Sequence, residues 1–169
     1  MKLIEALKEL KEIKRKTQDL LEKIGMHCAY LSFETPTYPE QSKEVAKWVQ
    51  AHRDLVQRSE KLTLAIHKTN LATEVTVELG GNKVTKPIAA WILRRRGLAV
   101  MELQAWGRLT DKNLKEGHSV DSSGNKVEIK IVRCYDPAER DKWRAALAEE
   151  PFLIDAKLEV ANAITDLME

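Results

Sequence analysis

Imidazole and thiol side chains are the groups in this sequence that could bind a soft metal ion. The candidates for a zinc site are His27, Cys28, His67, His118 and Cys134. Zinc sites draw pairs of ligands from short spacings such as Cys-x-x-Cys or His-x-x-x-His. The sequence contains neither spacing, and the adjacent pair His27-Cys28 is not a usual chelating arrangement. We therefore predict no metal centre and no cofactor.

The residues that could form a nucleophile and its base are poorly spaced for that chemistry. His52 and Ser59 fall on one side of a predicted helix, but two helical turns, about 10 Å, separate them along its axis. We interpret both as polar positions of a helix seam. The glycine-rich stretch at residues 80–83 lacks the strand–GxxxxGKS/T–helix layout of a phosphate-binding loop. We predict that the protein is not an enzyme.

A run of three arginines, Arg94, Arg95 and Arg96, is the strongest charge feature. Together with Arg108, it could follow a nucleic-acid backbone, which proteins contact through its phosphates. The alternative is a solvated or inter-subunit face that meets the acidic C-terminal helix. Three consecutive residues span about 300° of a helix, so one of them should be partly buried and paired. We favour this alternative.

Charge is unevenly distributed along the chain, although the formal net charge is only +2. Residues 85–115 carry a net charge of +5, and residues 136–169 carry −5. Segments of opposite charge can bind each other within a chain or between copies. The pattern predicts self-association as the main partnership, with other virion or shell proteins as further candidate partners. The small net charge gives no global field for nucleic acid or membranes.

Composition predicts a cytoplasmic protein, or a virion protein if the source is viral. Two cysteines in 169 residues are too few for a disulfide framework. Glutamate occupies the N-terminal segment where a signal peptide has its apolar core. No apolar run approaches the roughly 18 residues that a membrane span needs. We expect reduced thiols and no membrane partner.

Long heptad patterns predict two helices in the first half of the chain, at residues 1–25 and 40–70. Gly25 and Asn70 are interpreted as their C-terminal residues. The stretch between them contains two prolines and cannot be helical, and its apolar side chains predict a loop that lies against the protein. The two helices should form an antiparallel hairpin with inward-facing seams.

Period-two alternation predicts two short β-hairpins, at residues 74–84 and 119–133. Their turns are Gly80-Gly81-Asn82 and the stretch at residues 122–125. A lone two-stranded hairpin is marginal in water. The second hairpin is therefore expected to pair with the first one or with another subunit.

A third helix is predicted at residues 85–115 and a C-terminal helix at residues 137–168. Thr85 could cap the third helix, and glycines at positions 97 and 107 should weaken it. Asp136 is the expected start of the C-terminal helix. Pro151 should kink this helix or restart it.

Three stretches of the sequence, in this order, resemble the small bacterial family often called septicolysin. They are residues 2–7 (KLIEAL), residues 66–73 (IHKTNLAT) and residues 155–167 (DAKLEVANAITDL). Members of this family are helical and have no established function. The resemblance implies a self-assembling helical hairpin, and it singles out four polar positions: Thr69, Asn70, Asn162 and Asp166. These could line a ligand pocket, or Asn70 could end a helix and Asn162 fix its register.

These patterns predict a mainly α single domain, built as a long antiparallel helical hairpin or bundle with one or two short β-hairpins. The predicted function is structural: a homo-oligomer that forms through helical seams and β-hairpins. Size and composition also suit a phage virion component, such as a capsid or tail accessory protein. A nucleic-acid-associated protein is the other alternative. Charge reversal at Arg95 and Arg96 should change oligomer size in the first case and nucleic-acid retention in the last.

Overall fold

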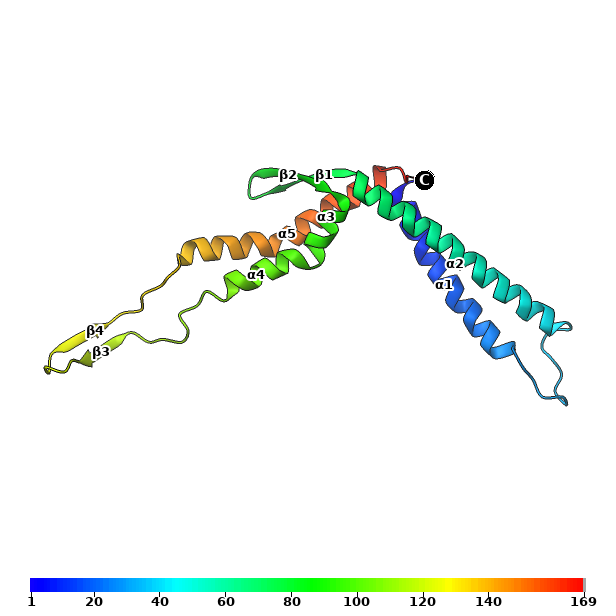
Figure 1. The fold of residues 1–169 in the computed structure, drawn as a ribbon, viewed down its shortest axis with the longest axis horizontal. Helices are drawn as coiled ribbons and strands as arrows, with labels where there is room; N and C mark the ends of the chain where they lie inside the picture. The colour runs from blue at the N-terminus through cyan, green and yellow to red at the C-terminus, as the bar shows by residue number, and fades with distance from the viewer. Residues whose placement is uncertain (169) are drawn as a thin grey trace. The chain divides into compact units, whose positions relative to one another are not determined.

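A computed structural model describes residues 1–168 and shows the predicted fold class, mainly α with two short antiparallel β-hairpins (Figure 1). The chain divides into two compact units. The first contains residues 1–75, residues 87–89 and the C-terminal residues from Leu158 onward. The second contains residues 76–86 and 90–157. Each unit therefore joins segments that are distant in the sequence.

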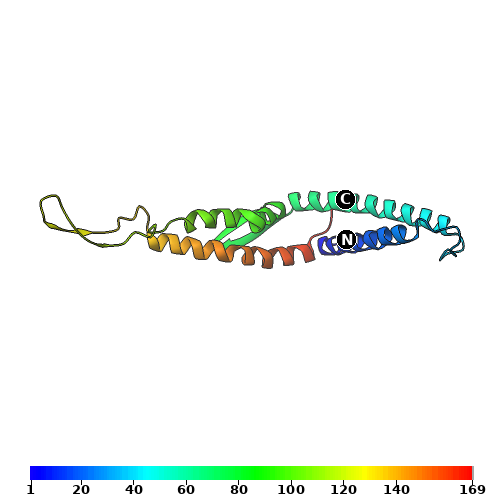
Figure 2. The same ribbon diagram turned by 90° about the horizontal axis from the view of Figure 1, so that it is seen from below.

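The predicted helical hairpin is present in the first unit as α1 (Leu3–His27) and α2 (Gln41–Ala72). The two helices lie side by side in both views (Figure 1, Figure 2). Their buried seam contains Leu3, Ala6, Ile13, Leu62, Ile66 and Thr69. The sequence predicted that α1 ends at Gly25 and α2 at Asn70. Each helix continues two residues further, because tertiary contacts hold its last turn.

An aromatic cluster holds the last turn of α1 against the start of α2. The rings of His27, Tyr38 and Trp48 lie with centroids 5.2 to 5.6 Å apart. The side-chain amide of buried Gln41 donates a hydrogen bond to the carbonyl oxygen of His27 at 2.9 Å. This bond satisfies a carbonyl that the end of a helix leaves unpaired.

The middle of the connector is exposed, which makes the prediction of a packed loop wrong. Tyr30, Leu31 and Phe33 project into solvent, and Phe33 is 82% exposed. A turn at this point is closed by a backbone hydrogen bond from Glu34 to Leu31, at 2.9 Å. The aromatic cluster at the base of the loop fixes its ends but covers none of these side chains.

Backbone hydrogen bonds join the two ends of the described chain. Lys2 and Asp166 form an antiparallel β-bridge, and the ammonium of Lys2 lies 2.9 Å from the carboxylate of Asp166. The hydroxyl of Thr69 accepts a hydrogen bond from the backbone amide of Met168 at 2.9 Å. The C-terminal helix therefore ends at Ile164, before the predicted residue 168, because the following residues form the bridge instead.

The first β-hairpin forms as predicted, from β1 (Glu74–Leu79) and β2 (Asn82–Pro87). Gly80 and Gly81 have φ angles of +57° and +81°. Such a pair of positive φ angles is typical of a type I′ turn, which favours glycine and matches the twist of a hairpin. Val77 is buried while the neighbouring polar residues are exposed, as the alternation predicts.

One continuous helical stretch follows, made of α3 (Ile88–Leu93), a π-helical segment η1 (Arg94–Leu98) and α4 (Ala99–Gly107). The π segment contains Gly97, one of the two predicted weak points. The helix ends at the other weak point, Gly107, and not at residue 115.

Thr85 does not cap this helix as predicted, because it lies within β2. Its hydroxyl is 2.7 Å from that of Thr76 on β1, in a cross-strand hydrogen bond. Pairing with β1 therefore extends the strand to Pro87, and the helix starts only after it.

The C-terminal helix, α5 (Pro137–Ile164), begins where Asp136 accepts a hydrogen bond from the amide of Ala138 at 2.8 Å. It continues through Pro151 without restarting. One side of the helix is buried, through Leu147, Glu150, Ile154, Leu158 and Ala161.

The second β-hairpin consists of β3 (Gly117–Val120) and β4 (Lys126–Ile129). Every residue of both strands is exposed. The two hairpins form separate sheets, so the predicted pairing between them is wrong. The carboxylate of Asp121 organises the turn by accepting hydrogen bonds from the amides of Ser123 and Asn125, both at 2.9 Å.

The joined ends should depend on Thr69, whose side chain is fully buried. Thr69→Val removes the acceptor for the amide of Met168 and should lower the free energy of unfolding by about 1–3 kcal/mol. Urea unfolding followed by circular dichroism measures this loss. Thr63→Val, at a half-buried position of the same helix, is the matched control. Equal effects of the two changes would contradict the role given to Thr69.

Candidate functional site

Arg94 is held between two carboxylates in the second unit. Its guanidinium donates two hydrogen bonds to Glu102 and two to Glu150 of α5. Only 16% of the Arg94 side chain and 6% of the Glu150 side chain are exposed. The hydrogen bonds from Arg94 lower the pKa of Glu102, and the two carboxylates raise the pKa of Arg94 further above its ordinary value. The clamp therefore fixes the α3–α4 stretch against α5.

Arg95 also pairs with the acidic helix, through Asp155. Both arginines lie in the π-helical segment η1. This segment was not predicted. The pairs agree with the interpretation that the arginine run meets the acidic C-terminal helix, here within one chain. Arg96 and Arg108 are exposed, and their role as a basic face stays a prediction.

A second ion-pair network connects the two segments that lead into β3 and out of β4. Arg133 donates two hydrogen bonds to the carboxylate of Asp111, at 2.6 and 2.7 Å. These bonds lower the pKa of Asp111. The hydroxyl of Tyr135 donates to the same carboxylate at 3.1 Å. Arg140 reaches the carbonyl oxygen of Leu109 at 3.0 Å. No sequence motif marks this network, because its members come from separate elements.

The four polar positions singled out by the family resemblance have different environments. Thr69 and Asp166 both take part in the junction of the chain ends. The side-chain oxygen of Asn70 is buried without a hydrogen-bond partner among the described residues, and Asn162 is half-buried. A groove at this junction, of about 440 Å³, is lined by residues such as Leu62 and not by the asparagines. A ligand role for these positions stays a prediction.

The histidines and cysteines do not gather into a site within residues 1–168. No group of three or more histidine, cysteine, aspartate or glutamate side chains in this range could hold a metal ion. Cys28 and Cys134 are exposed free thiols. His52 and Ser59 are half-buried on the seam of α2, where the heptad pattern predicted them.

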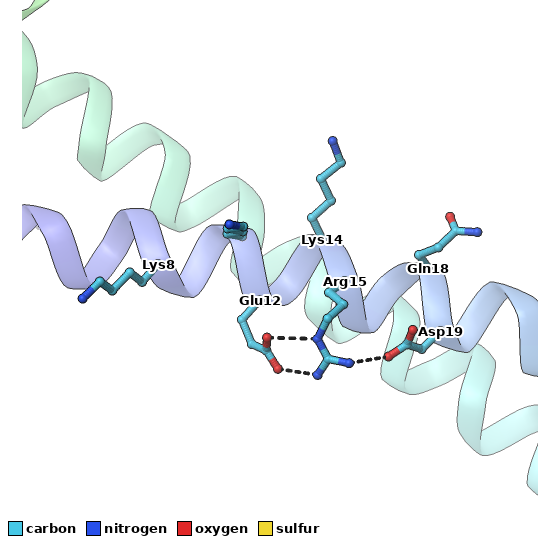
Figure 3. A pocket seen from close by; sticks show the side chains of 7 residues that line it. Lys8, Glu12, Lys14, Arg15, Gln18 and Asp19 are labelled. Atoms are coloured by element: carbon cyan, nitrogen blue, oxygen red, sulfur yellow. Dashed lines mark hydrogen bonds and ion pairs between the residues drawn. The ribbon is translucent and has the colours of Figure 1, made fainter.

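A depression on α1 is lined by lysines and by a chain of charged residues (Figure 3). Arg15 donates hydrogen bonds to Glu12 at 2.7 and 3.1 Å and to Asp19 at 2.9 Å. All the lining residues belong to one helix. Pairs at this spacing are typical of a solvated helix face and contribute little to stability.

Many large apolar side chains of the protein are exposed. Among residues 1–168, 26 large apolar side chains are exposed, while 13 apolar residues are buried. The exposed ones include members of α1, α2, α4, α5 and both strands of the second hairpin. The heptad patterns predicted inward-facing seams but not how much apolar surface would remain uncovered. Large exposed apolar surfaces are typical of interaction sites.

No protein-family model matches the sequence, and no curated protein is significantly similar to it. One solved structure is similar over 99% of both chains, with a TM-score of 0.60 and 21% sequence identity. It is described as a functionally unknown conserved protein from Corynebacterium diphtheriae. At this identity the similarity shows a shared fold alone. No described helix has the length and apolar content needed to cross a membrane.

Arg94→Met should be strongly destabilising, because it leaves the carboxylate of Glu150 buried without its partner. The expected loss is about 3–5 kcal/mol in the free energy of unfolding, measured by urea titration. Arg96→Met changes an exposed member of the same run and should stay within about 0.5 kcal/mol of the wild type. Similar losses for the two variants would show that the clamp does not stabilise the protein.

The Asp111 network should make the second unit sensitive to acid. In the folded protein the pKa of Asp111 lies below its ordinary value of 3.8. The ionised carboxylate therefore stabilises the folded state fully at pH values above 3.8. This stabilisation is lost as the pH falls through the lowered pKa. Asp111→Asn should therefore be less stable than the wild type at pH 7, and the difference should shrink towards pH 2. Tryptophan fluorescence, to which stacked Trp106 and Trp143 contribute, can follow the unfolding. A difference that is independent of pH would contradict this assignment.

Proposed function

We propose that this protein is a structural, self-assembling protein that works as a homo-oligomer and has no catalytic role. The observation that carries the proposal is the excess of exposed surface on a single chain. The chain exposes 12559 Å² for a mass of 19.3 kDa. A compact monomer of this mass exposes about 8,500 Å², and two separate compact proteins of half the mass expose about 10,200 Å² together.

The kind of surface supports the same proposal. Obligate oligomers have apolar interfaces that resemble a protein core cut in half, and they leave apolar side chains uncovered in the separated subunit. The exposed apolar side chains lie on several helices and on the β3–β4 hairpin, so more than one contact area is available to other copies. Closed homo-oligomers are the commonest assemblies of soluble proteins. A virion or shell component, cytoplasmic or in a particle, is a specific form of this proposal.

The nucleic-acid alternative has less support. Arg94 and Arg95 already bind carboxylates of α5, so only Arg96 and Arg108 of the predicted basic face remain exposed. A protein that binds nucleic acid through few phosphate contacts gains little electrostatic affinity from them. The structural neighbour has no function that could be transferred, and membership in the septicolysin-like family stays a proposal.

Light scattering on the eluate of a size-exclusion column tests the proposal. We expect a mass of at least twice 19.3 kDa, at both low and high salt if apolar contacts dominate. Dilution to nanomolar concentration should lower the mass, because association follows mass action. A 19.3 kDa species at every accessible concentration would refute self-assembly. Anisotropy of labelled duplex DNA with the wild type and Arg96→Glu would then test the nucleic-acid alternative.

A further inference from the structure

The α1–α2 hairpin has two long sides along its seam, and they differ in chemistry. On one side Arg58 of α2 donates hydrogen bonds to Glu9 of α1 at 2.7 and 3.1 Å, and this ion pair connects the two helices. The other side, which we call the open flank, has exposed apolar residues. They are Leu7 and Leu21 of α1 and Val49 and Val56 of α2, which are 40%, 50%, 52% and 49% exposed.

Helix periodicity places these residues along two lines. Leu7, Lys14 and Leu21 recur every seven residues on α1, as Val49 and Val56 do on α2, and residues at this spacing share one side of a helix. A groove of about 500 Å³ joins the two lines, because Lys14 and Val56 both line it. The groove is also lined by Leu10, Ile13, Thr17, Ser59 and Glu60.

Two opposite charges lie at this groove without a salt bridge. Lys14 and Glu60 are both exposed, and neither forms an ion pair with another side chain of residues 1–168. Figure 3 shows Lys14 extending from α1 on the side opposite to the Glu12–Arg15–Asp19 chain. The open flank therefore combines an apolar surface with one positive and one negative group.

We propose that the open flank binds the open flank of a second copy of this chain, so that two hairpins form a four-helix bundle. This inference rests on the proposed self-assembly and names one of its surfaces. A contact between identical surfaces is two-fold symmetric, and each pair of contacting residues therefore occurs twice. Two hairpins would bury eight exposed apolar side chains in this way, four from each chain.

The charges select one of two symmetric arrangements. A two-fold axis parallel to the helices stacks α1 on α2 of the partner subunit, which brings Lys14 to Glu60 of the partner subunit. An axis across the helices at the level of the groove stacks α1 on itself and opposes Lys14 with the same lysine, which is unfavourable. Opposite charges at the rim of an interface fix its register in this way.

The arrangement with the two-fold axis parallel to the helices also places apolar residues of the two chains opposite each other. Leu21 follows Lys14 by seven residues, about 10 Å along the axis. Val49 precedes Val56 by the same distance on an antiparallel helix, so Leu21 and Val49 stand at the same level. Stacking α1 on α2 of the partner subunit therefore places leucine over valine as well as lysine over glutamate.

A charge-swap experiment tests the inference in the full chain. Lys14→Glu and Glu60→Lys should each raise the dissociation constant of the oligomer about tenfold, measured by sedimentation velocity, because each opposes like charges twice. The double variant Lys14→Glu/Glu60→Lys should restore the wild-type value. Lys23→Glu, at an exposed position of α1 about 200° around the helix from Leu21, is the control and should leave association unchanged.

Cysteine crosslinking gives a second readout that does not depend on weakening the assembly. In a background with Cys28→Ser and Cys134→Ser, a chain with Leu21→Cys is mixed with a chain carrying Val49→Cys. Oxidation should give a disulfide-linked dimer, and a chain with Glu22→Cys in place of Leu21→Cys should not.

The outcomes separate the two proposals. A wild type that stays monomeric refutes self-assembly and this interface together. A wild-type oligomer that is indifferent to the charge swaps and gives no crosslink refutes the open flank alone, and leaves surfaces such as the β3–β4 hairpin as the contact. Restoration by the double variant together with the selective crosslink establishes the interface.

Discussion

The hydrogen-bonded junction between the two ends of the described chain is the constraint on which the first unit depends. The β-bridge of Lys2 with Asp166 ties the start of α1 to the residues after α5, and Thr69 ties the same residues to the end of α2. These short segments meet at one place, so three elements distant in the sequence must end there. The buried residues Leu3 and Ile66 lie close to this junction in sequence and pack with it.

The second unit combines ion pairs with buried apolar residues such as Trp91, Leu147 and Ile154. The clamp of Arg94 and the pair of Arg95 with Asp155 connect the α3–α4 stretch to α5, and the Asp111 network holds the segments next to β3 and β4. Arg94 and Arg95 of the basic segment at residues 85–115 therefore pair within the chain with the acidic C-terminal segment.

Sequence periodicity predicted the two long helices, the C-terminal helix and both β-hairpins, because heptads and period-two alternation are local signals. The Gly80-Gly81 turn was predictable for the same reason. The ends of the elements were not, since Thr85 and the residues after Ile164 are placed by partners far along the chain. The π-helical segment was missed, and with it the fact that both Arg94 and Arg95 reach α5. The amount of uncovered apolar surface, from which the proposed function follows, depends on which seams the fold leaves open and has no local signature.

The exposed β3–β4 hairpin has a consequence for dynamics. None of the side chains on its strands is buried, so the backbone ladder, the Asp121 turn and the Asp111 network beside it stabilise it without a core of its own. Local opening of such a hairpin requires a small fraction of the free energy needed to unfold the helices. Its amide protons should exchange with solvent on a much shorter timescale than those of the buried seam of α1 and α2. Any partner that orders this hairpin loses part of its binding energy to the conformational entropy of the strands, so contacts made there are suited to reversible association.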